Sequence, residues 1–216
     1  MQLLEELIER NGGVDMYVYA QITRGMEFGR NHVFPARVTP SVFAMAAPLP
    51  KLSAADRERG FSAITVEDFR WGRCDIKTTA LLANVLMKQQ AAEAGGTEAI
   101  IVRDGDVLEG AATSLFLVVD GVVSTPPDSR RILPGTTRNT ALELATGTIT
   151  VKVRRITIDE LHKADEVWLS AATRDVIPVT KIDGRPVGEG KPGPMWRRMD
   201  AAFGALRARL AGTRAM

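Results

Sequence analysis

The sequence has one cysteine, Cys74, and two histidines in 216 residues. A single cysteine excludes an internal disulfide framework and favours a reducing compartment, so we expect a cytoplasmic protein. Few histidines and cysteines also argue against a metal site of the usual ligand set, and we expect no bound metal. No apolar run is long enough to cross a membrane. Neither a G-x-x-x-x-G-K-[ST] phosphate loop nor a G-x-S-x-G nucleophile motif occurs. The sequence therefore lacks this phosphate-binding device and gives no support to an esterase-type nucleophile.

The composition is that of a soluble globular protein. Hydrophobic residues make up 45% and charged residues 25% of the chain, and the formal net charge is +2. Because no long basic run occurs, nothing in the charge pattern favours nucleic acid as a partner. The length suits one large domain or two small ones, and Pro48 and Pro50 indicate a linker. We therefore expect domains over residues 1–50 and 51–216.

Apolar periodicity predicts a strand-rich α+β fold. Two Asp-Gly turns, at Asp104-Gly105 and Asp120-Gly121, each separate short apolar segments and predict hairpins. A mostly antiparallel sheet or barrel with packed helices follows from this pattern. Helices are expected at 1–11, after Thr79 to about 94, 139–145, 158–163 and 194–210. Strands are expected at 14–23, 42–47, 61–71, 98–103, 107–109, 115–119, 122–125, 149–156, 166–170 and 177–182, the last paired with 186–187.

Lys77 stands between a predicted strand and a predicted amphipathic helix, whose apolar face would consist of Leu81, Leu82, Val85 and Leu86. Thr78 and Thr79 occupy the positions expected of a helix N-cap. A cation is normally disfavoured at the positive end of a helix dipole, so a lysine there would be pushed toward its neutral, nucleophilic form. The alternative is a surface lysine in a loop.

Two further features could bind a flat, phosphorylated ligand. Glu109 precedes a run of small residues, 110–114, where a carboxylate could lie against a ring and pair with a protonated ring nitrogen. The turn Gly135-Thr136-Thr137 opens a predicted helix, where free backbone N–H groups and hydroxyls could hold a phosphate. The alternatives are a solvent-facing glutamate and an ordinary helix cap.

A third pair, Arg30 and His32, lies in a glycine-bearing loop. An arginine close to a histidine can bind a carboxylate through a forked pair of hydrogen bonds. A solvated loop without a ligand explains the same pattern.

Together these segments resemble the fold-type IV pyridoxal-phosphate enzymes, a group that includes the D-amino acid and branched-chain aminotransferases. The resemblance covers essentially the whole chain. The segments 21–25, 30–35 and 70–77 look most like the D-amino acid branch, and 108–114 and 133–138 match further blocks of the group.

The resemblance implies transamination between D-amino acids and 2-oxo acids, with pyridoxal 5′-phosphate as cofactor. Lys77 would form the internal aldimine and carry the proton between substrate and cofactor, and Glu109 would hold the proton on the ring nitrogen. The other cofactor contacts implied are Thr113, Gly135, Thr136, Thr137 and Thr173. Arg30 and His32 would bind the substrate carboxylate from the partner subunit of a homodimer.

The sequence also departs from the group. Ala111 and Ala112 stand where polar residues are usual. The group carries an upstream segment with strands of the small domain, a phosphate-binding arginine and a substrate-side tyrosine, and we expect this chain to lack it. Three alternatives therefore stay open: an aminodeoxychorismate lyase, a branched-chain aminotransferase, and a truncated remnant with little or no activity.

Overall fold

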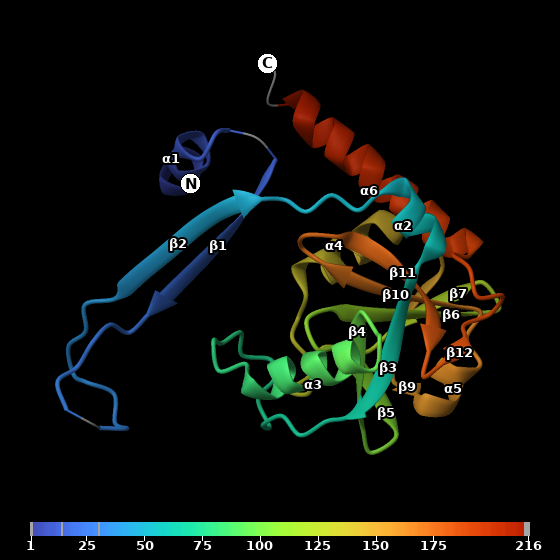
Figure 1. The fold of residues 1–216 in the computed structure, drawn as a ribbon, viewed down its shortest axis with the longest axis horizontal. Helices are drawn as coiled ribbons and strands as arrows, with labels where there is room; N and C mark the ends of the chain where they lie inside the picture. The colour runs from blue at the N-terminus through green and yellow to red at the C-terminus, as the bar shows by residue number, and fades with distance from the viewer. Residues whose placement is uncertain (1, 14, 30, 214–216) are drawn as a thin grey trace. The chain divides into compact units, whose positions relative to one another are not determined.

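The computed structural model describes residues 2–13, 15–29 and 31–213. The chain divides into two compact units, Met1–Lys51 and Leu52–Met216 (Figure 1). The interpretation of these units as the remainder of a small domain and a cofactor-binding domain stays a prediction.

The first unit contains one helix and a two-stranded antiparallel sheet. Helix α1 spans Gln2–Arg10, and strands β1 (Met16–Thr23) and β2 (Ser41–Pro48) pair with Tyr19 opposite Met45. The predicted helix and both strands are confirmed.

The second unit is built on a ten-stranded mixed sheet. Its strands are β3 Phe61–Glu67, β4 Glu98–Arg103, β5 Asp106–Gly110, β6 Ser114–Val119, β7 Val122–Thr125, β8 Val151–Val153, β9 Ile156–Thr157, β10 Glu166–Ala171, β11 Asp175–Ile182 and β12 Arg185–Pro186. They follow the order β8-β7-β6-β10-β11-β3-β4-β5-β9, with β12 paired to β11. Only β11–β3, β3–β4 and β7–β8 are parallel pairs among the described strands. The predicted α+β class is confirmed.

Helices cover this sheet. They are α2 Ala54–Arg59, α3 Leu82–Glu93, α4 Thr136–Ala145, α5 Ile158–His162 and α6 Pro194–Thr213. In one apolar cluster, Trp196 and Phe203 of α6 pack with Phe116 and Trp168 of the sheet, and residues of α4 join them. In another, Met87 of α3 packs with residues of β4. Among the described residues, no helix is long and apolar enough to cross a membrane.

The two hairpins form at the predicted turns. Asp104 and Gly105 have φ of 55° and 76°, and Asp120 and Gly121 have φ of 50° and 73°. A two-residue loop with both central φ angles positive matches the twist of the flanking strands, and Asp-Gly tolerates this conformation at low cost.

Several predicted element boundaries are wrong. Helix α3 begins at Leu82, not directly after Thr79, and its cap residue makes no side-chain hydrogen bond. Its predicted apolar face is exposed: Leu82 is 72% accessible, whereas Met87 and Ala91 are buried. The predicted strand 149–156 is divided into β8 and β9, and β3 ends at Glu67. Helix α2 replaces part of the predicted linker, because the Ser53 side chain accepts a hydrogen bond from the Asp56 N–H and caps it.

Candidate active site

A cavity of about 1090 Å³ in the second unit brings most of the predicted site residues together. Its walls come from the segment between β3 and α3, from α3, from the end of β5, from the start of α4 and from the end of β10. The predicted site residues that line it are Lys77, Glu109, Thr113, Gly135, Thr136 and Thr137. These residues are far apart in sequence, and the sheet places them around one space large enough for a cofactor and a small substrate.

Lys77 lies in irregular chain, exposed within this cavity wall. The prediction that it abuts the positive end of a helix is wrong, because α3 begins only at Leu82. Thr78 is no helix cap either; its hydroxyl accepts a hydrogen bond from the Ala80 N–H at 3.2 Å. A helix dipole therefore gives no argument for a reactive lysine at this position.

Glu109 is buried near the end of β5, with 6% of its surface accessible. Arg70 Nη1 donates to Glu109 Oε1 at 2.6 Å, and the Leu133 backbone N–H donates to Oε2 at 3.1 Å. Burial raises the pKa of Glu109 above its ordinary value, while both hydrogen bonds act in the opposite direction. The alternative of a solvent-facing glutamate is thus wrong.

Thr113 and the small residues before it are fixed by neighbouring side chains. The Thr113 hydroxyl donates to Glu98 Oε2 at 3.3 Å, and Asn84 Nδ2 donates to the Ala111 carbonyl at 2.8 Å. A side chain of α3 therefore holds the run that follows Glu109.

The start of α4 forms a site suited to an anion. Gly135 is the cap residue in extended conformation, and in the part of the chain that the structure describes it provides no side-chain hydrogen bond to the first turn. A Cβ on Gly135 would overlap Ser114 Oγ, so a larger residue there would force the serine hydroxyl to move. Ser170 also lines the cavity, and its buried hydroxyl has no hydrogen-bond partner in the described structure. Free N–H groups, two threonines and a helix dipole are the chemistry that binds a phosphate.

Arg138, which the sequence places near this turn, has a structural role. Its buried guanidinium donates to Thr125 Oγ1, to Asp128 and to the Pro126 carbonyl. These bonds fasten α4 to the chain that follows β7.

Of the remaining predicted site residues, one belongs to the second unit and two belong to the first. Thr173 lies in the turn between β10 and β11 and does not line the cavity, although Ala171 and Ala172 do. His32 is exposed in the segment between β1 and β2 of the first unit. Arg30 lies outside the described residues. No cluster of three or more metal-ligating side chains occurs in the described parts of the chain.

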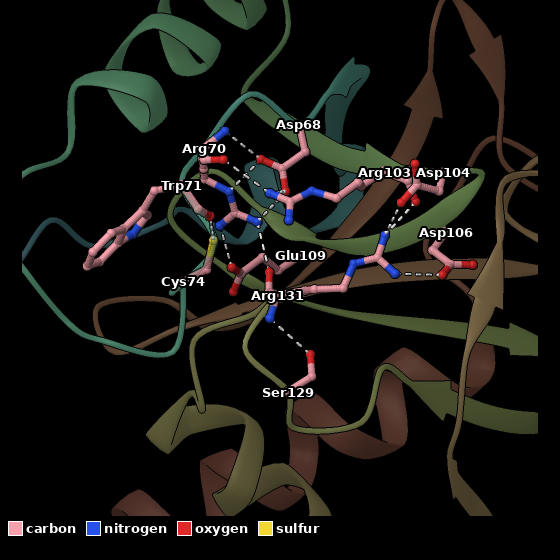
Figure 2. A network of polar contacts seen from close by, with 10 residues as sticks. All are labelled: Asp68, Arg70, Trp71, Cys74, Arg103, Asp104, Asp106, Glu109, Ser129 and Arg131. Atoms are coloured by element: carbon pink, nitrogen blue, oxygen red, sulfur yellow. Dashed lines mark hydrogen bonds and ion pairs between the residues drawn. The ribbon is translucent and has the colours of Figure 1, made fainter.

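Sequence reasoning missed Asp68, Arg70 and Arg103, which form a series of ion pairs that leads to Glu109 (Figure 2). It also missed the hydroxyls of Ser114 and Ser170. Asp68 and Arg70 stand two positions apart just before Lys77. That spacing is the only local signal, and the contact between Arg70 and Glu109 is long-range.

Comparison with known proteins decides the family. The family model described as amino-transferase class IV matches residues 1–182. This chain belongs to the class IV aminotransferases. The prediction that it is an aminotransferase enzyme is therefore confirmed, and so is the resemblance on which that prediction rested.

Proteins similar in sequence to this chain include two D-alanine aminotransferases. The chain is 42% identical over 201 residues to D-alanine aminotransferase of Bacillus licheniformis, covering 93% of this chain and 70% of that protein. It is 39% identical over 205 residues to that of Staphylococcus haemolyticus, covering 94% and 72%.

Among solved structures, it resembles the branched-chain amino acid aminotransferase of Escherichia coli, with a TM-score of 0.82 and 32% identity over 95% of this chain and 71% of that one. A second branched-chain amino acid aminotransferase, solved with pyridoxamine 5′-phosphate, has a TM-score of 0.83 and 29% identity, covering 95% and 70%.

Proposed function

We propose that this class IV aminotransferase transfers amino groups between D-amino acids, with D-alanine as the type, and 2-oxo acids, using pyridoxal 5′-phosphate. The observation that carries the proposal is that Lys77, Glu109 and the Gly135–Thr137 turn line one cavity. The D-alanine aminotransferases among its relatives support the D-amino acid branch.

The residues present fit the cofactor. The exposed N–H groups of α4, with Thr136 and Thr137, suit its phosphate, and the glycine cap leaves room for close approach. Each Glu109 oxygen accepts one hydrogen bond from the protein and keeps a further lone-pair position for a ring N–H. When bound, the cofactor supplies an electrophilic carbon and a ring that accepts electrons from the substrate. Lys77 would bind it and then move a proton between substrate Cα and cofactor C4′.

Substrate binding and assembly belong to the same proposal. Arg30 and His32 would bind the substrate carboxylate from the partner subunit, so the active enzyme would be a homodimer. Thr113 would contact the cofactor, while Thr173 is retained only as an implied contact. A cytoplasmic location also stays a prediction.

The first experiment tests the covalent link to Lys77. Purified protein with added pyridoxal 5′-phosphate should show a visible absorption band, and borohydride reduction should fix the cofactor to the peptide that contains Lys77. Lys77→Ala should lose both signals and the amino transfer. Lys88→Ala, a second lysine of the cavity wall, should keep the covalent link. A wild-type protein that gives no band would refute the proposal.

A second candidate, branched-chain amino acid transamination, is favoured by the structural likeness to branched-chain enzymes. Initial rates with D-alanine and with L-leucine, each with 2-oxoglutarate, separate the two. Faster turnover of L-leucine would replace the D-amino acid proposal. Pyruvate release from aminodeoxychorismate without an oxo acid would indicate the lyase, and a bound cofactor without turnover would indicate the remnant.

A further inference from the structure

Four side chains of alternating charge form a chain of ion pairs that reaches the cavity wall, and we call them the charged quartet: Asp68, Arg70, Arg103 and Glu109 (Figure 2). The Asp68 side chain is 0% accessible and the Arg70 side chain 5%. Arg103 Nη2 lies 2.8 Å from Asp68 Oδ2, and Arg70 Nη1 lies 2.6 Å from Glu109 Oε1. Only Glu109 and Arg70 of this quartet line the cavity.

Asp68 holds the Arg70 guanidinium in one orientation. Arg70 Nε donates to Asp68 Oδ1 at 2.9 Å, and Nη2 donates to Oδ2 at 3.1 Å, a forked pair that fixes the plane of the group. Nη2 also donates to the Arg131 carbonyl at 3.0 Å. The remaining terminal nitrogen, Nη1, is thereby directed at Glu109.

The orientation of Arg70 matters because it places a cation against the buried carboxyl of Glu109. A carboxylate as buried as Glu109 is unstable in its ionised form unless a cation pairs with it. Burial alone would lower the pKa of Arg70, but hydrogen bonds to Asp68 and Glu109 raise it above the ordinary value, so Arg70 stays cationic. Arg103 compensates the charge of Asp68, which leaves the Arg70 cation to compensate Glu109.

Other titratable groups also face Glu109. The Cys74 thiol, whose pKa is raised by burial, lies within electrostatic range of Arg70 and Glu109. Glu98 lies against Gly110, the residue after Glu109, and pairs with Lys88 at 3.0 Å. Among these groups, Arg70 is the cation that contacts Glu109 directly.

We propose that Arg70 is the positioning residue that keeps Glu109 ionised and directed into the cavity, where Glu109 accepts a hydrogen bond from a protonated heteroaromatic ring nitrogen. This inference rests on the proposed function for the identity of the ring. The role of Arg70 toward Glu109 is a property of the protein alone and is tested without cofactor.

The first test titrates Glu109 in cofactor-free protein. Its carboxyl carbon is followed by ¹³C NMR in protein labelled at glutamate and is assigned with Glu109→Gln. In Arg70→Gln we expect the midpoint to rise by about 1–3 pH units, because a cation in contact lowers a carboxyl pKa by that amount. Arg70→Lys restores the cation and should return the midpoint toward wild type. Arg73→Gln, an exposed arginine paired with Asp75, is the matched control and should leave it unchanged.

The second test measures what Glu109 does for a ring nitrogen. Dissociation constants are compared for pyridoxal 5′-phosphate and for its 1-deaza analogue, in which C–H replaces the ring nitrogen. Wild-type protein should prefer the natural cofactor by about tenfold or more, the value of a hydrogen bond to a charged group. Arg70→Gln should weaken this preference, because the Glu109 carboxyl is then no longer held toward the ring nitrogen. Part of the preference should remain, since a protonated Glu109 can still donate to an unprotonated ring nitrogen. Arg73→Gln should keep it.

A midpoint for Glu109 that is the same in wild type, Arg70→Gln and Arg70→Lys would overturn the proposal. If Arg70→Gln does not fold, the Arg70→Lys variant tests the proposal. We expect this variant to prefer pyridoxal 5′-phosphate over the 1-deaza analogue less strongly than wild type does, because the fork to Asp68 is lost. Full retention of both the Glu109 midpoint and this preference would overturn the proposal. If wild type binds neither cofactor, the proposed function fails, and the titration still decides the role of Arg70.

Discussion

At the scale of single residues, Gly135 is closely approached by a neighbouring side chain at the start of α4. Its Cβ would overlap Ser114 Oγ, whereas Ser114 Cβ would lie at an ordinary 3.6 Å. We expect Gly135→Ala to lower the free energy of unfolding by about 1–3 kcal/mol, as overpacking does, and to weaken cofactor binding. Urea unfolding and a cofactor titration measure the two effects.

Ser114 provides the matched test of that clash. Ser114→Ala removes the hydroxyl and keeps the Cβ, so the double variant should recover most of the stability that Gly135→Ala loses. Ser114→Ala alone is the control. A double variant as unstable as Gly135→Ala alone would show that the hydroxyl is not the obstacle.

The residues that line the cavity could be predicted from the sequence where the signal is local. Lys77, Glu109 and the Gly135–Thr137 turn each have a recognisable neighbourhood, and the cavity collects them. The pairing of Arg70 with Glu109 joins two segments through the order of the strands, so no short window contains it. The missing partner of Ser170 Oγ is likewise a property of packing and has no sequence signal.

At the scale of elements, the short helix α5 depends on a capping box. The Thr157 N–H donates to Glu160 Oε2 at 2.8 Å, and Arg154 Nη1 donates to Glu160 Oε1 at 2.7 Å. The pKa of Glu160 is lowered, first by the Thr157 backbone hydrogen bond, against the opposing effect of burial, and then by Arg154. The folded state therefore favours the ionised carboxylate.

This lowered pKa sets the direction of a pH effect. The contribution of Glu160 to stability is fully present above its unfolded pKa of about 4.5 and is lost as the pH falls through the folded value. We expect Glu160→Gln to cost about 0.5–1 kcal/mol at pH 7, discounted for partial exposure, and progressively less below pH 4.5. Urea unfolding across this range measures it. Glu143→Gln, on the exposed surface of α4, is the control, and an equal pH dependence for both variants would contradict the assignment.

Element types were more predictable than element faces. The Asp-Gly hairpins could be predicted from local backbone preferences, because an Asp-Gly pair readily adopts positive φ at two successive residues. The face of α3 was predicted wrongly, since both of its sides carry apolar residues. The sheet packs against the side with the small Ala91 and the flexible Met87, leaving Leu82 exposed.

At the scale of the whole molecule, the sequence could predict two segments of different character but not their assembly. The second unit contains Lys77 and Glu109, while His32 belongs to the first. Whether residues of the first unit act on the cavity of their own chain or of a second chain depends on contacts between chains, and neither the periodicity nor the motifs of the sequence predict such contacts. The proposal that Arg30 acts from the partner subunit therefore needs a test that distinguishes the two chains.

Mixed dimers provide that test. Lys77→Ala and Arg30→Ala should each transfer amino groups poorly from D-alanine. In a heterodimer of the two variants, one site would combine an intact Lys77 with the partner subunit's intact Arg30. After subunit exchange at equal amounts, half of the dimers are mixed, and each has one complete site, so we expect about a quarter of wild-type activity.

If Arg30 acted within its own chain, neither site of the heterodimer would be complete and mixing would restore nothing. Exchange itself is verified with differently tagged subunits, and each variant mixed with itself is the control. Recovered activity that scales with the fraction of mixed dimers is the expected result, since only the mixed dimer joins the two intact residues. The absence of recovery, with exchange demonstrated, would refute a site shared between subunits.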